Sequence, residues 1–296
     1  MKSRARVLIV GKGAFGEAIA ELLYESHIFA KFYDRNPETN PDYTTLEEAC
    51  QNSDIIFLAI PSSALPNVCE ELEEAVSQVQ IIIGLSKGIN RFGTVADTIE
   101  HFFPKVPYGI LSGPMLANEI HSGLFAGATI ASKKREVRSL VKELFPSSHL
   151  ILTENEYPRA TALFASLKNI YAVGAGIITE KVWGQNVLGI YISQSIEEMK
   201  TIARIKGYPV QPLFDSGIAD FIATSTSHHS CNVGAGKAIV CGNDAQDCEG
   251  MVSLPHLQKM LPHNTLRSLP LLAAISEVAR GKDPMKLLEA VRFSKE

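Results

Sequence analysis

Up to about residue 153, short runs of apolar, often β-branched residues alternate with longer segments whose apolar positions recur every three or four residues. The runs predict buried parallel strands, and the longer segments predict helices packed against them. Strands are expected over residues 6–10, 29–33, 54–60, 80–85, 108–111, 127–131 and 150–153, with helices such as 17–24, 64–76 and 135–144 between them. This alternation predicts a parallel, doubly wound α/β sheet.

After Thr153 the strand pattern stops and only helical spacing remains. Helices are expected over residues 158–178, 187–206, 213–225, 256–260, 271–280 and 284–291. Apolar positions at this spacing predict a compact, predominantly α-helical bundle. The chain is therefore expected to form two domains, one over residues 1–153 and the other over residues 154–296.

The first predicted strand leads directly into a glycine-rich turn. Gly11, Gly13 and Gly16 fit the pattern G-x-G-x-x-G, and helical spacing follows at once. The first glycine permits a tight turn, the second lets the backbone approach a pyrophosphate, and the third lets the helix pack on the strand. The N–H groups that open the helix then face the phosphates. The sequence therefore predicts that residues 1–153 bind a dinucleotide.

The ends of the other predicted strands carry candidate ligand contacts. Asp34 ends the second strand, where a carboxylate accepts hydrogen bonds from an adenosine ribose and repels a 2′-phosphate, which favours NAD. The neighbouring Arg35 is suited to a 2′-phosphate, so NADP stays open. Pro61, Lys87 and Gly113 follow later strands. Ligands of open α/β sheets lie beyond such carboxyl ends.

Composition narrows the class of protein. The chain has 296 residues, of which 46% are hydrophobic and 20% charged, as in ordinary globular proteins. A net charge of −4 gives no electrostatic basis for nucleic-acid binding. No apolar run of about 18 residues is uninterrupted, so no membrane span is expected. The five cysteines include no C-x-x-C pair, which favours a reducing, cytoplasmic setting. The spacing of Cys231, Cys241 and Cys248 with the preceding His228-His229 pair fits no standard zinc pattern, so no metal site is predicted.

Lys168 falls within an apolar stripe of the predicted helix 158–178. A lysine there must reach solvent, pair with an acid or take part in chemistry, and partial burial would prepare it for proton transfer. A snorkelling surface lysine is the alternative interpretation. Asp220 and Thr224, four residues apart, share a face of another predicted helix, and Asp220 is either a partner for Lys168 or an exposed acid. Asn169 is a candidate donor to a substrate hydroxyl.

Taken together, these motifs resemble the bacterial type of NAD(P)-dependent glycerol-3-phosphate dehydrogenase. The resemblance extends from the Gly11 turn to about Val291. Besides the glycine turn, it is carried by Ile60-Pro-Ser-Ser-Ala-Leu65, Ser86-Lys-Gly-Ile89, Leu111-Ser-Gly-Pro114 with Ala117-x-Glu119, Ser166-Leu-Lys-Asn169 before Gly174-Ala-Gly176, Gly217-x-x-Asp220 and Cys248-Glu-Gly250. Several ordered motifs at matching spacing are far more specific than any one of them.

The resemblance implies a Rossmann domain followed by a helical domain like the C-terminal domain of 6-phosphogluconate dehydrogenase. It implies hydride transfer between dihydroxyacetone phosphate and glycerol 3-phosphate, in a cytoplasmic homodimer. Lys168 is then the acid/base, Lys87 contacts substrate and cofactor, and Asp220 lies beside the reacting carbon. The remaining implied substrate contacts are Gly113, Asn169, Thr224, Ser230 and Asn232. The remaining implied cofactor contacts are Gly11, Gly13, Ala14, Phe15, Gly16, Asp34, Arg35, Pro61, Ala117 and Glu249.

The chain departs from the family pattern at two positions. Cys231 replaces the arginine that anchors the substrate phosphate in the family, and Met115 replaces a serine. Losing an arginine–phosphate pair costs on the order of 2–5 kcal/mol, unless His228, His229 or Lys237 compensates. Two alternatives therefore stay open: the same machinery acting on another small ketone, in a more apolar pocket shaped by Met115 and Cys231, or a non-catalytic NAD(H)-binding regulatory protein.

Overall fold

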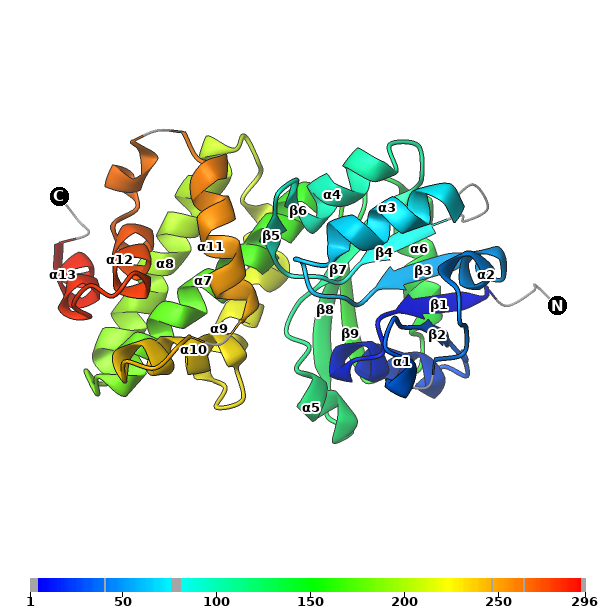
Figure 1. The fold of residues 1–296 in the computed structure, drawn as a ribbon, viewed down its shortest axis with the longest axis horizontal. Coiled ribbons are helices and arrows are strands. Elements are labelled where there is room, and N and C mark those ends of the chain that lie inside the picture. The colour runs from blue at the N-terminus through cyan, green and yellow to red at the C-terminus, as the bar shows by residue number, and fades with distance from the viewer. Residues whose placement is uncertain (1–4, 40, 76–80, 246, 263, 294–296) are drawn as a thin grey trace. The chain divides into compact units, whose positions relative to one another are not determined.

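The computed structural model describes residues 5–39, 41–75, 81–245, 247–262 and 264–293 (Figure 1). The chain forms two compact units. The first unit contains Met1–Lys87 and Thr94–Ala162, and the second contains Gly88–Gly93 and Leu163–Glu296. The chain therefore passes between the units after Lys87, Gly93 and Ala162. The division of ligand binding between residues 1–153 and 154–296 stays a prediction.

The first unit is built on a seven-stranded sheet in its described part. In sheet order the strands are β2 (Lys31–Tyr33), β1 (Val7–Val10), β3 (Ile55–Leu58), β4 (Ile81–Gly84), β7 (Tyr108–Ser112), β8 (Ala126–Ala131) and β9 (Leu150–Asn155). All seven runs predicted from the sequence are strands in the structure. Gln80, expected to open the fourth strand, lies outside the described residues.

The strand directions agree with the prediction for most of the sheet. The strands from β2 to β7 are parallel, which confirms the doubly wound α/β class. β8 is antiparallel to β7, however, and β9 is parallel to β8, so the expectation of a wholly parallel sheet is wrong at this edge. A parallel crossover normally needs a helix that traverses the sheet. The connection from β7 to β8 contains only the short helix α5 (Ala117–His121), which contacts the first helix instead.

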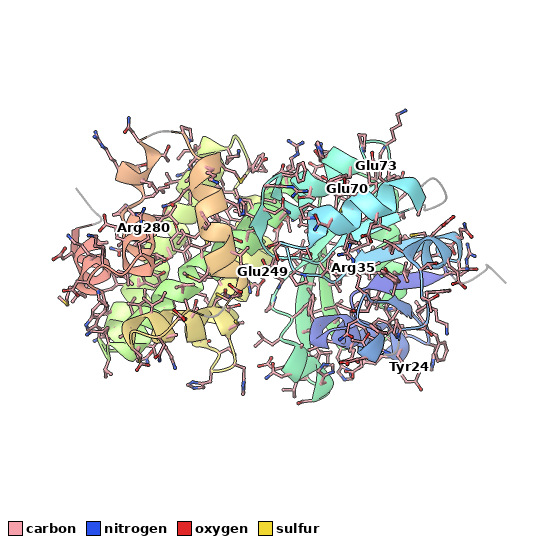
Figure 2. The ribbon with its side chains drawn as sticks, in the orientation of Figure 1. Tyr24, Arg35, Glu70, Glu73, Glu249 and Arg280 are labelled. Atoms are coloured by element: carbon pink, nitrogen blue, oxygen red, sulfur yellow. The ribbon has the colours of Figure 1, made fainter. Side chains whose placement is uncertain are left out.

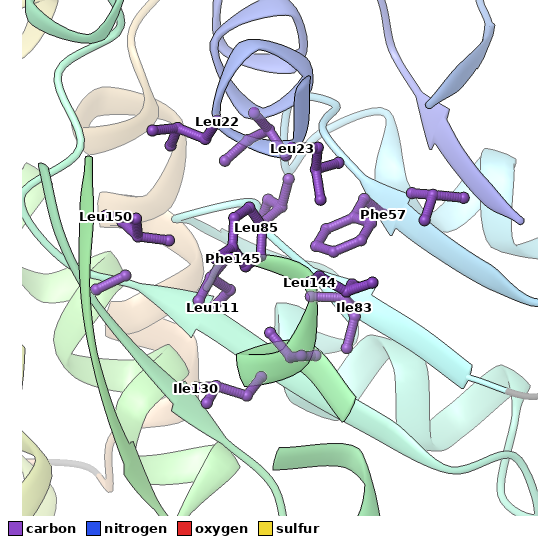
Figure 3. Close-up of a cluster of buried hydrophobic side chains, with 14 of the residues drawn as sticks. Leu22, Leu23, Phe57, Ile83, Leu85, Leu111, Ile130, Leu144, Phe145 and Leu150 are labelled. Atoms are coloured by element: carbon purple, nitrogen blue, oxygen red, sulfur yellow. The ribbon is translucent and has the colours of Figure 1, made fainter. Parts of the chain in front are cut away.

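Helices cover both faces of this sheet. The helices of the first unit are α1 (Ala14–Glu25), α2 (Leu46–Gln51), α3 (Leu65–Ala75), α4 (Val95–Phe102), α5 and α6 (Arg135–Leu144), with the 3-10 turn η1 (Pro37–Thr39). Side chains of α1, α5 and α6 pack with Val7 and Ile9 of β1 in one core, part of which is shown in Figure 3. Side chains of α2, α3 and α4 pack with Leu8 and Val10 in the other. The alternation along each strand therefore fills two hydrophobic layers.

The second unit is mostly helical. Its helices are α7 (Pro158–Glu180), α8 (Gln185–Ile205), the π-helical turn η3 (Leu213–Gly217), α9 (Ile218–Thr226), α10 (Cys231–Val240), α11 (Glu249–Met260), the 3-10 turn η4 (Thr265–Ser268), α12 (Pro270–Ala279) and α13 (Met285–Phe293). The short strands β5 (Ile89–Asn90) and β6 (Gly93–Thr94) pair with each other where the chain passes between the units. By length and composition alone α7 is apolar enough to cross a membrane, but its most apolar window is completely buried in the protein.

The sequence did not predict α10 or the first two turns of α11. Glycines at 234 and 236 lower the helix propensity of α10. In the structure α10 packs closely against α7. A Cβ on Gly236 of α10 would lie 2.0 Å from the carbonyl oxygen of Val173 in α7, and a Cβ on Gly176 of α7 would lie 2.1 Å from the carbonyl oxygen of Val233 in α10. The glycines therefore allow two helix backbones to meet, and this packing outweighs their poor propensity.

Candidate functional site

In the first unit, the glycine turn lies where the order of the strands reverses. β2 and β3 flank β1 on opposite sides, so the end of β1 is a topological switch point, the usual ligand position in open α/β sheets. Gly11 has φ +102°, and a Cβ there would lie 2.5 Å from the carbonyl oxygen of Ala59 at the end of β3. A Cβ on Gly16 would lie 2.1 Å from the oxygen of Gly11. A Cβ on Gly13, in contrast, would meet no atom within 4 Å.

This geometry fits a dinucleotide. Gly11 and Gly16 bring strand and helix together, while the space beside Gly13 stays open at the start of α1. The first N–H groups of a helix have no acceptor within that helix, and they attract phosphate. Gly13 provides no side chain to cap them. The residues of the turn would therefore hold a pyrophosphate through backbone N–H groups.

Asp34 is fixed by two backbone donors. Its Oδ2 accepts a hydrogen bond of 2.6 Å from the N–H of Lys12, and its Oδ1 accepts one of 2.8 Å from the N–H of Asn36. A carboxylate has about four lone-pair positions, so it retains capacity for ribose hydroxyls. Arg35, labelled in Figure 2, is bound through Nη2 to Glu71 of α3. The side chain suited to a 2′-phosphate is thus paired with an acid.

Three predicted site residues of the first unit come together at Lys87. The Nζ of Lys87 donates a hydrogen bond of 2.7 Å to the carbonyl oxygen of Gly113. The same nitrogen lies 5.9 Å from the ring centroid of Phe15, within the range of a cation–π contact. A Cβ on Gly113 would lie 2.4 Å from the oxygen of Gly127, so only glycine fits there. The ends of β4 and β7 and the first turn of α1 thereby present a cation next to the glycine turn.

The other predicted cofactor residues divide between the units. Pro61 follows β3, and its carbonyl oxygen accepts the N–H of Ala64. The carbonyl oxygen of Ala14 lies 3.2 Å from Nε2 of His121 in α5, the helix that begins at Ala117. Glu249 opens α11 in the second unit and is partly exposed (Figure 2). Glu249 is therefore the one predicted cofactor residue that does not belong to the first unit.

In the second unit, Lys168 is buried and paired. Its Nζ donates a hydrogen bond of 2.7 Å to Oγ1 of Thr224 and lies 3.1 Å from Oδ1 of Asp220. The two charged side chains are only 8% and 3% exposed. The expectation that Asp220 pairs with Lys168 is confirmed, and the interpretation of Lys168 as a surface lysine is wrong. The π-helical turn η3, a feature often found at functional sites, directly precedes the helix that carries Asp220 and Thr224.

A second hydrogen-bonded chain begins at the next residue of α7. Nδ2 of Asn232 donates to Oδ1 of Asn169 over 2.9 Å, and Oδ1 of Asn232 accepts the N–H of Gly250 over 2.9 Å. Both asparagines are buried. Ser230 caps α10 by accepting the N–H of Val233 over 3.3 Å. The structure thus places the predicted residues in two buried polar groups that begin at adjacent residues of α7: Lys168 with Thr224 and Asp220, and Asn169 with Asn232.

The sequence did not reveal the residues that bind the segment directly after Lys87. Oγ of Ser166 donates to the carbonyl oxygen of Gly88 over 3.0 Å, and Oγ of Ser253 accepts the N–H of Ile89 over 2.9 Å. Both serines are buried in the second unit. A serine within an otherwise apolar helical stripe was the available signal, but its partner 78 residues away leaves no trace in the sequence pattern.

The two departures from the family pattern have different surroundings. Met115 is 4% exposed and belongs to a hydrophobic core of the first unit, so its observed role is packing. Cys231 is exposed at the first position of α10. His228 and His229 are exposed just before that helix, and Lys237 is partly buried within it. Throughout the described part of the chain, no three His, Cys, Asp or Glu side chains are grouped to hold a metal ion.

Comparison with known proteins identifies the family. Residues 36–138 match the model of the NAD-dependent glycerol-3-phosphate dehydrogenase N-terminus, and residues 158–289 match that of the C-terminus. The chain is 32% identical to a glycerol-3-phosphate dehydrogenase (NAD(P)+) of Acinetobacter baylyi, over 81% of this chain and 74% of the relative. It is 30% identical to the enzyme of that name from Alcanivorax borkumensis, over 83% and 80%.

Solved structures share the fold. A glycerol-3-phosphate dehydrogenase from Coxiella burnetii superposes with a TM-score of 0.87 at 20% identity, covering 97% of this chain and 98% of that one. The yeast enzyme superposes with a TM-score of 0.78 at 20% identity, covering 98% and 99%. Family models that match residues 36–138 and 158–289, and relatives that are 30% and 32% identical, agree: the chain is a member of the NAD-dependent glycerol-3-phosphate dehydrogenase family.

Proposed function

We propose that this chain interconverts dihydroxyacetone phosphate and sn-glycerol 3-phosphate with NAD as its preferred dinucleotide, and that Lys168 is the acid/base. The observation that carries the proposal is the buried lysine with two fixed partners, 2.7 Å from Thr224 and 3.1 Å from Asp220. The names of the relatives support this substrate pair.

Lys168 handles the proton of this reaction. Reduction of the ketone adds a hydride at carbon, which the nicotinamide supplies when bound, and a proton at oxygen. The ammonium of Lys168 stabilises the negative charge that develops on that oxygen and delivers the proton to it. Thr224 and Asp220 accept from the ammonium and so fix the direction of the bond to Nζ. The carboxylate of Asp220 also compensates a positive charge that would be costly to bury alone.

The neighbouring amides orient the substrate. Asn169 follows Lys168 on α7, and its side chain is held by Asn232, whose own oxygen is bound to the N–H of Gly250. Amide groups fixed in this way are suited to the hydroxyl groups of a three-carbon substrate. Ser230, the N-cap of α10, is the further predicted substrate contact on this side of the unit.

The preference for NAD rests on Asp34 and Arg35. The carboxylate of Asp34 is fixed at the end of β2 by two backbone N–H groups, ready to accept ribose hydroxyls and to repel a 2′-phosphate. Arg35 is engaged by Glu71 and is therefore partly neutralised for a 2′-phosphate. Lys87, next to Phe15 and Gly113, is the proposed cation that contacts substrate and cofactor.

The presence of a cysteine at position 231, where the family has an arginine, favours a second candidate substrate. A thiol at the first position of α10 cannot form the paired hydrogen bonds that an arginine makes to phosphate. A less phosphorylated or larger ketone is therefore the second candidate, with the same roles for Lys168 and Asp220. Replacement of Cys231 by Arg distinguishes the two, because the variant should raise turnover only of a phosphorylated substrate.

The proposal is tested by following NADH oxidation with dihydroxyacetone phosphate and with a panel of unphosphorylated ketones. We expect dihydroxyacetone phosphate to be the fastest substrate. Lys168→Ala should lower turnover by about 100- to 10,000-fold while NADH affinity is kept. The turnover of Lys168→Arg should fall by a comparable factor, because arginine keeps the positive charge beside Asp220 but does not release its proton. Lys181→Ala, which removes an exposed lysine of the same unit, is the control. Wild-type turnover in Lys168→Arg would remove Lys168 from the acid/base role.

A further inference from the structure

Two cysteines meet where α10 and α11 begin. Cys231 is the first residue of α10, and Cys248 is the N-cap of α11. Neither cysteine is in a disulfide; Cys231 is exposed, and Cys248 is only 4% exposed. The side chain of Cys231 is within hydrogen-bonding distance of the Cys248 thiol. The two sulfurs are therefore neighbours although 17 residues separate them in the chain.

Buried polar contacts hold these two helix starts together independently of the sulfurs. Asn232, next to Cys231, accepts the N–H of Gly250 over 2.9 Å, and Gly250 lies two residues after Cys248. A Cβ on Gly250 would lie 2.4 Å from the carbonyl oxygen of Asn169 and 2.9 Å from Oδ1 of Asn232. Only glycine permits so close an approach, so the residues next to the two cysteines are held by buried contacts.

We propose that Cys231 and Cys248 are a redox modification site, which forms a reversible disulfide on reaction with a small disulfide of the glutathione type. The pair is asymmetric. Exposed Cys231 is the sulfur that an oxidant in solution reaches, and buried Cys248 is the one that closes the bond. Oxidation-sensitive cysteines typically combine an accessible sulfur with an adjacent resolving thiol.

The surroundings of Cys248 protect its thiol from direct oxidation. Burial is the main reason that the pKa of its thiol is raised to about 11, with a smaller contribution from the neighbouring Cys231 sulfur. A thiol held protonated and away from solvent is inert toward a bulky oxidant. It reacts when a mixed disulfide forms on the adjacent sulfur, because the reacting atoms are then already in contact.

The exchange balances in two steps. The deprotonated sulfur of Cys231 attacks one sulfur of the small disulfide, whose S–S bond breaks, and the departing thiolate takes up the proton that Cys231 released. Deprotonated Cys248 then attacks the sulfur of Cys231, the mixed disulfide breaks, and a second small thiolate leaves with the proton of Cys248. The two cysteines lose two electrons and two protons, which reduce one small disulfide to two thiols.

A disulfide between Cys231 and Cys248 would lie next to predicted substrate and cofactor residues. Cys231 lies between Ser230 and Asn232, and Cys248 precedes Glu249. A disulfide shortens the separation of two sulfurs to about 2.05 Å, so the starts of α10 and α11 must adjust around Asn232. We therefore expect lower turnover in the oxidised protein, a consequence that rests on the proposed function, whereas bond formation itself does not.

The test incubates the whole protein with mixtures of glutathione and glutathione disulfide, blocks the remaining thiols and maps the peptides by mass spectrometry. We expect a cross-link between the peptides of Cys231 and Cys248 that dithiothreitol reverses. Cys231→Ser and Cys248→Ser should each abolish it. Cys241→Ser should keep it, because the exposed thiol of Cys241 bonds to Glu180 instead. A glutathione adduct that persists on Cys231 in the wild type, or a cross-link to Cys241, would overturn the proposal.

The activity measurement is a separate arm. Oxidised wild-type protein should lose at least tenfold in turnover and recover it with dithiothreitol, while Cys231→Ser, which cannot form the first mixed disulfide, should have the same turnover with and without the oxidant. A loss in oxidised Cys231→Ser equal to that of the wild type would show that the Cys231–Cys248 disulfide is not the cause. Because the cross-link is detected by mass, a chain without dehydrogenase activity would fail the proposed function and still leave this inference decided.

Discussion

The two units organise their functional groups in different ways. In the first unit the contacts are made largely by backbone: two N–H groups hold Asp34, and a carbonyl oxygen holds Lys87. In the second unit buried side chains bind one another, as Lys168 does with Asp220 and Asn169 with Asn232. The backbone contacts join residues 2, 22 and 26 positions apart in the sequence, whereas the side-chain pairs join residues 56 and 63 positions apart. The second kind is therefore harder to predict and more costly to break.

The largest effect should come from removing one partner of the buried ion pair. Asp220→Ala leaves the Lys168 ammonium buried opposite an apolar group, which costs on the order of 3–5 kcal/mol of unfolding free energy. The single tryptophan, Trp183, belongs to the second unit and reports its urea unfolding. Asp215→Ala is the matched control, because this acid lies on the adjacent turn η3 and bonds to Gln211 at the surface. Equal destabilisation by the two variants would contradict the special cost of the buried pair.

A second buried acid predicts the pH dependence of stability. Glu198 of α8 accepts hydrogen bonds from the Tyr171 hydroxyl and from the N–H groups of Leu271 and Leu272, which open α12. Burial nevertheless raises the pKa of this carboxyl to about 7, above its ordinary value of 4.5. Between pH 4.5 and about pH 7, Glu198 is protonated in the native state and ionised in the unfolded state. Protonation of Glu198 therefore contributes fully to the free energy of unfolding below pH 4.5, and this contribution falls by about 3 kcal/mol as the pH rises to about 7.

Glu198→Gln should remove this dependence. The difference in unfolding free energy between wild type and variant should change by about 3 kcal/mol from pH 4.5 to pH 7, in the direction that favours the wild type at low pH. The contributions of all other groups cancel in that difference. Glu197→Gln, at a neighbouring position that is 65% exposed, should give a flat difference. Parallel curves for wild type and Glu198→Gln would show that Glu198 is ionised alike in both states.

The glycine turn can be divided into a packing position and a ligand position. Gly16→Ala places a Cβ 2.1 Å from the carbonyl oxygen of Gly11, far inside van der Waals contact, so we expect loss of both stability and NADH affinity. Gly13→Ala meets no protein atom, so stability should be unchanged. Its NADH affinity should nevertheless fall about tenfold or more, roughly 1.4 kcal/mol, if the pyrophosphate lies against that position. Thermal unfolding and NADH fluorescence titration separate the two effects. Unchanged affinity in Gly13→Ala would place the pyrophosphate elsewhere.

The sequence was most informative about the first unit. Strands such as Ile55–Leu58 are fully buried on both faces, and their continuous apolar runs identify them without knowledge of any partner. Strand direction is different, because an apolar run is the same in either direction. The reversal of β8 depends on the path of the chain through α5, which the pattern of residues does not contain.

In the second unit the sequence identified residues without their arrangement. Lys168 stood out because a charge interrupts an apolar stripe, yet only the contact with Asp220 distinguishes burial from snorkelling. Ser253 gave no signal, and Gly250 stood out only as part of the Cys248-Glu-Gly250 motif, since the contacts of these two residues are with Ile89 and Asn169 in other segments. Buried polar clusters are specified by pairs of residues distant in sequence, and one chain without its structure does not reveal such pairs.

The smallest expected effect concerns the choice of cofactor in the first unit. Glu71→Gln removes the acid that pairs with Arg35 and leaves the guanidinium to meet a 2′-phosphate. Both side chains are about half exposed, at 48% and 50%, and exposed pairs are worth less than about 1 kcal/mol. NADPH affinity should therefore rise about threefold while NADH affinity stays the same, as measured by fluorescence titration. Glu73→Gln on the same helix is the control for a general loss of negative charge (Figure 2). An equal rise in both variants would mean that long-range charge, and not the engagement of Arg35, sets the preference.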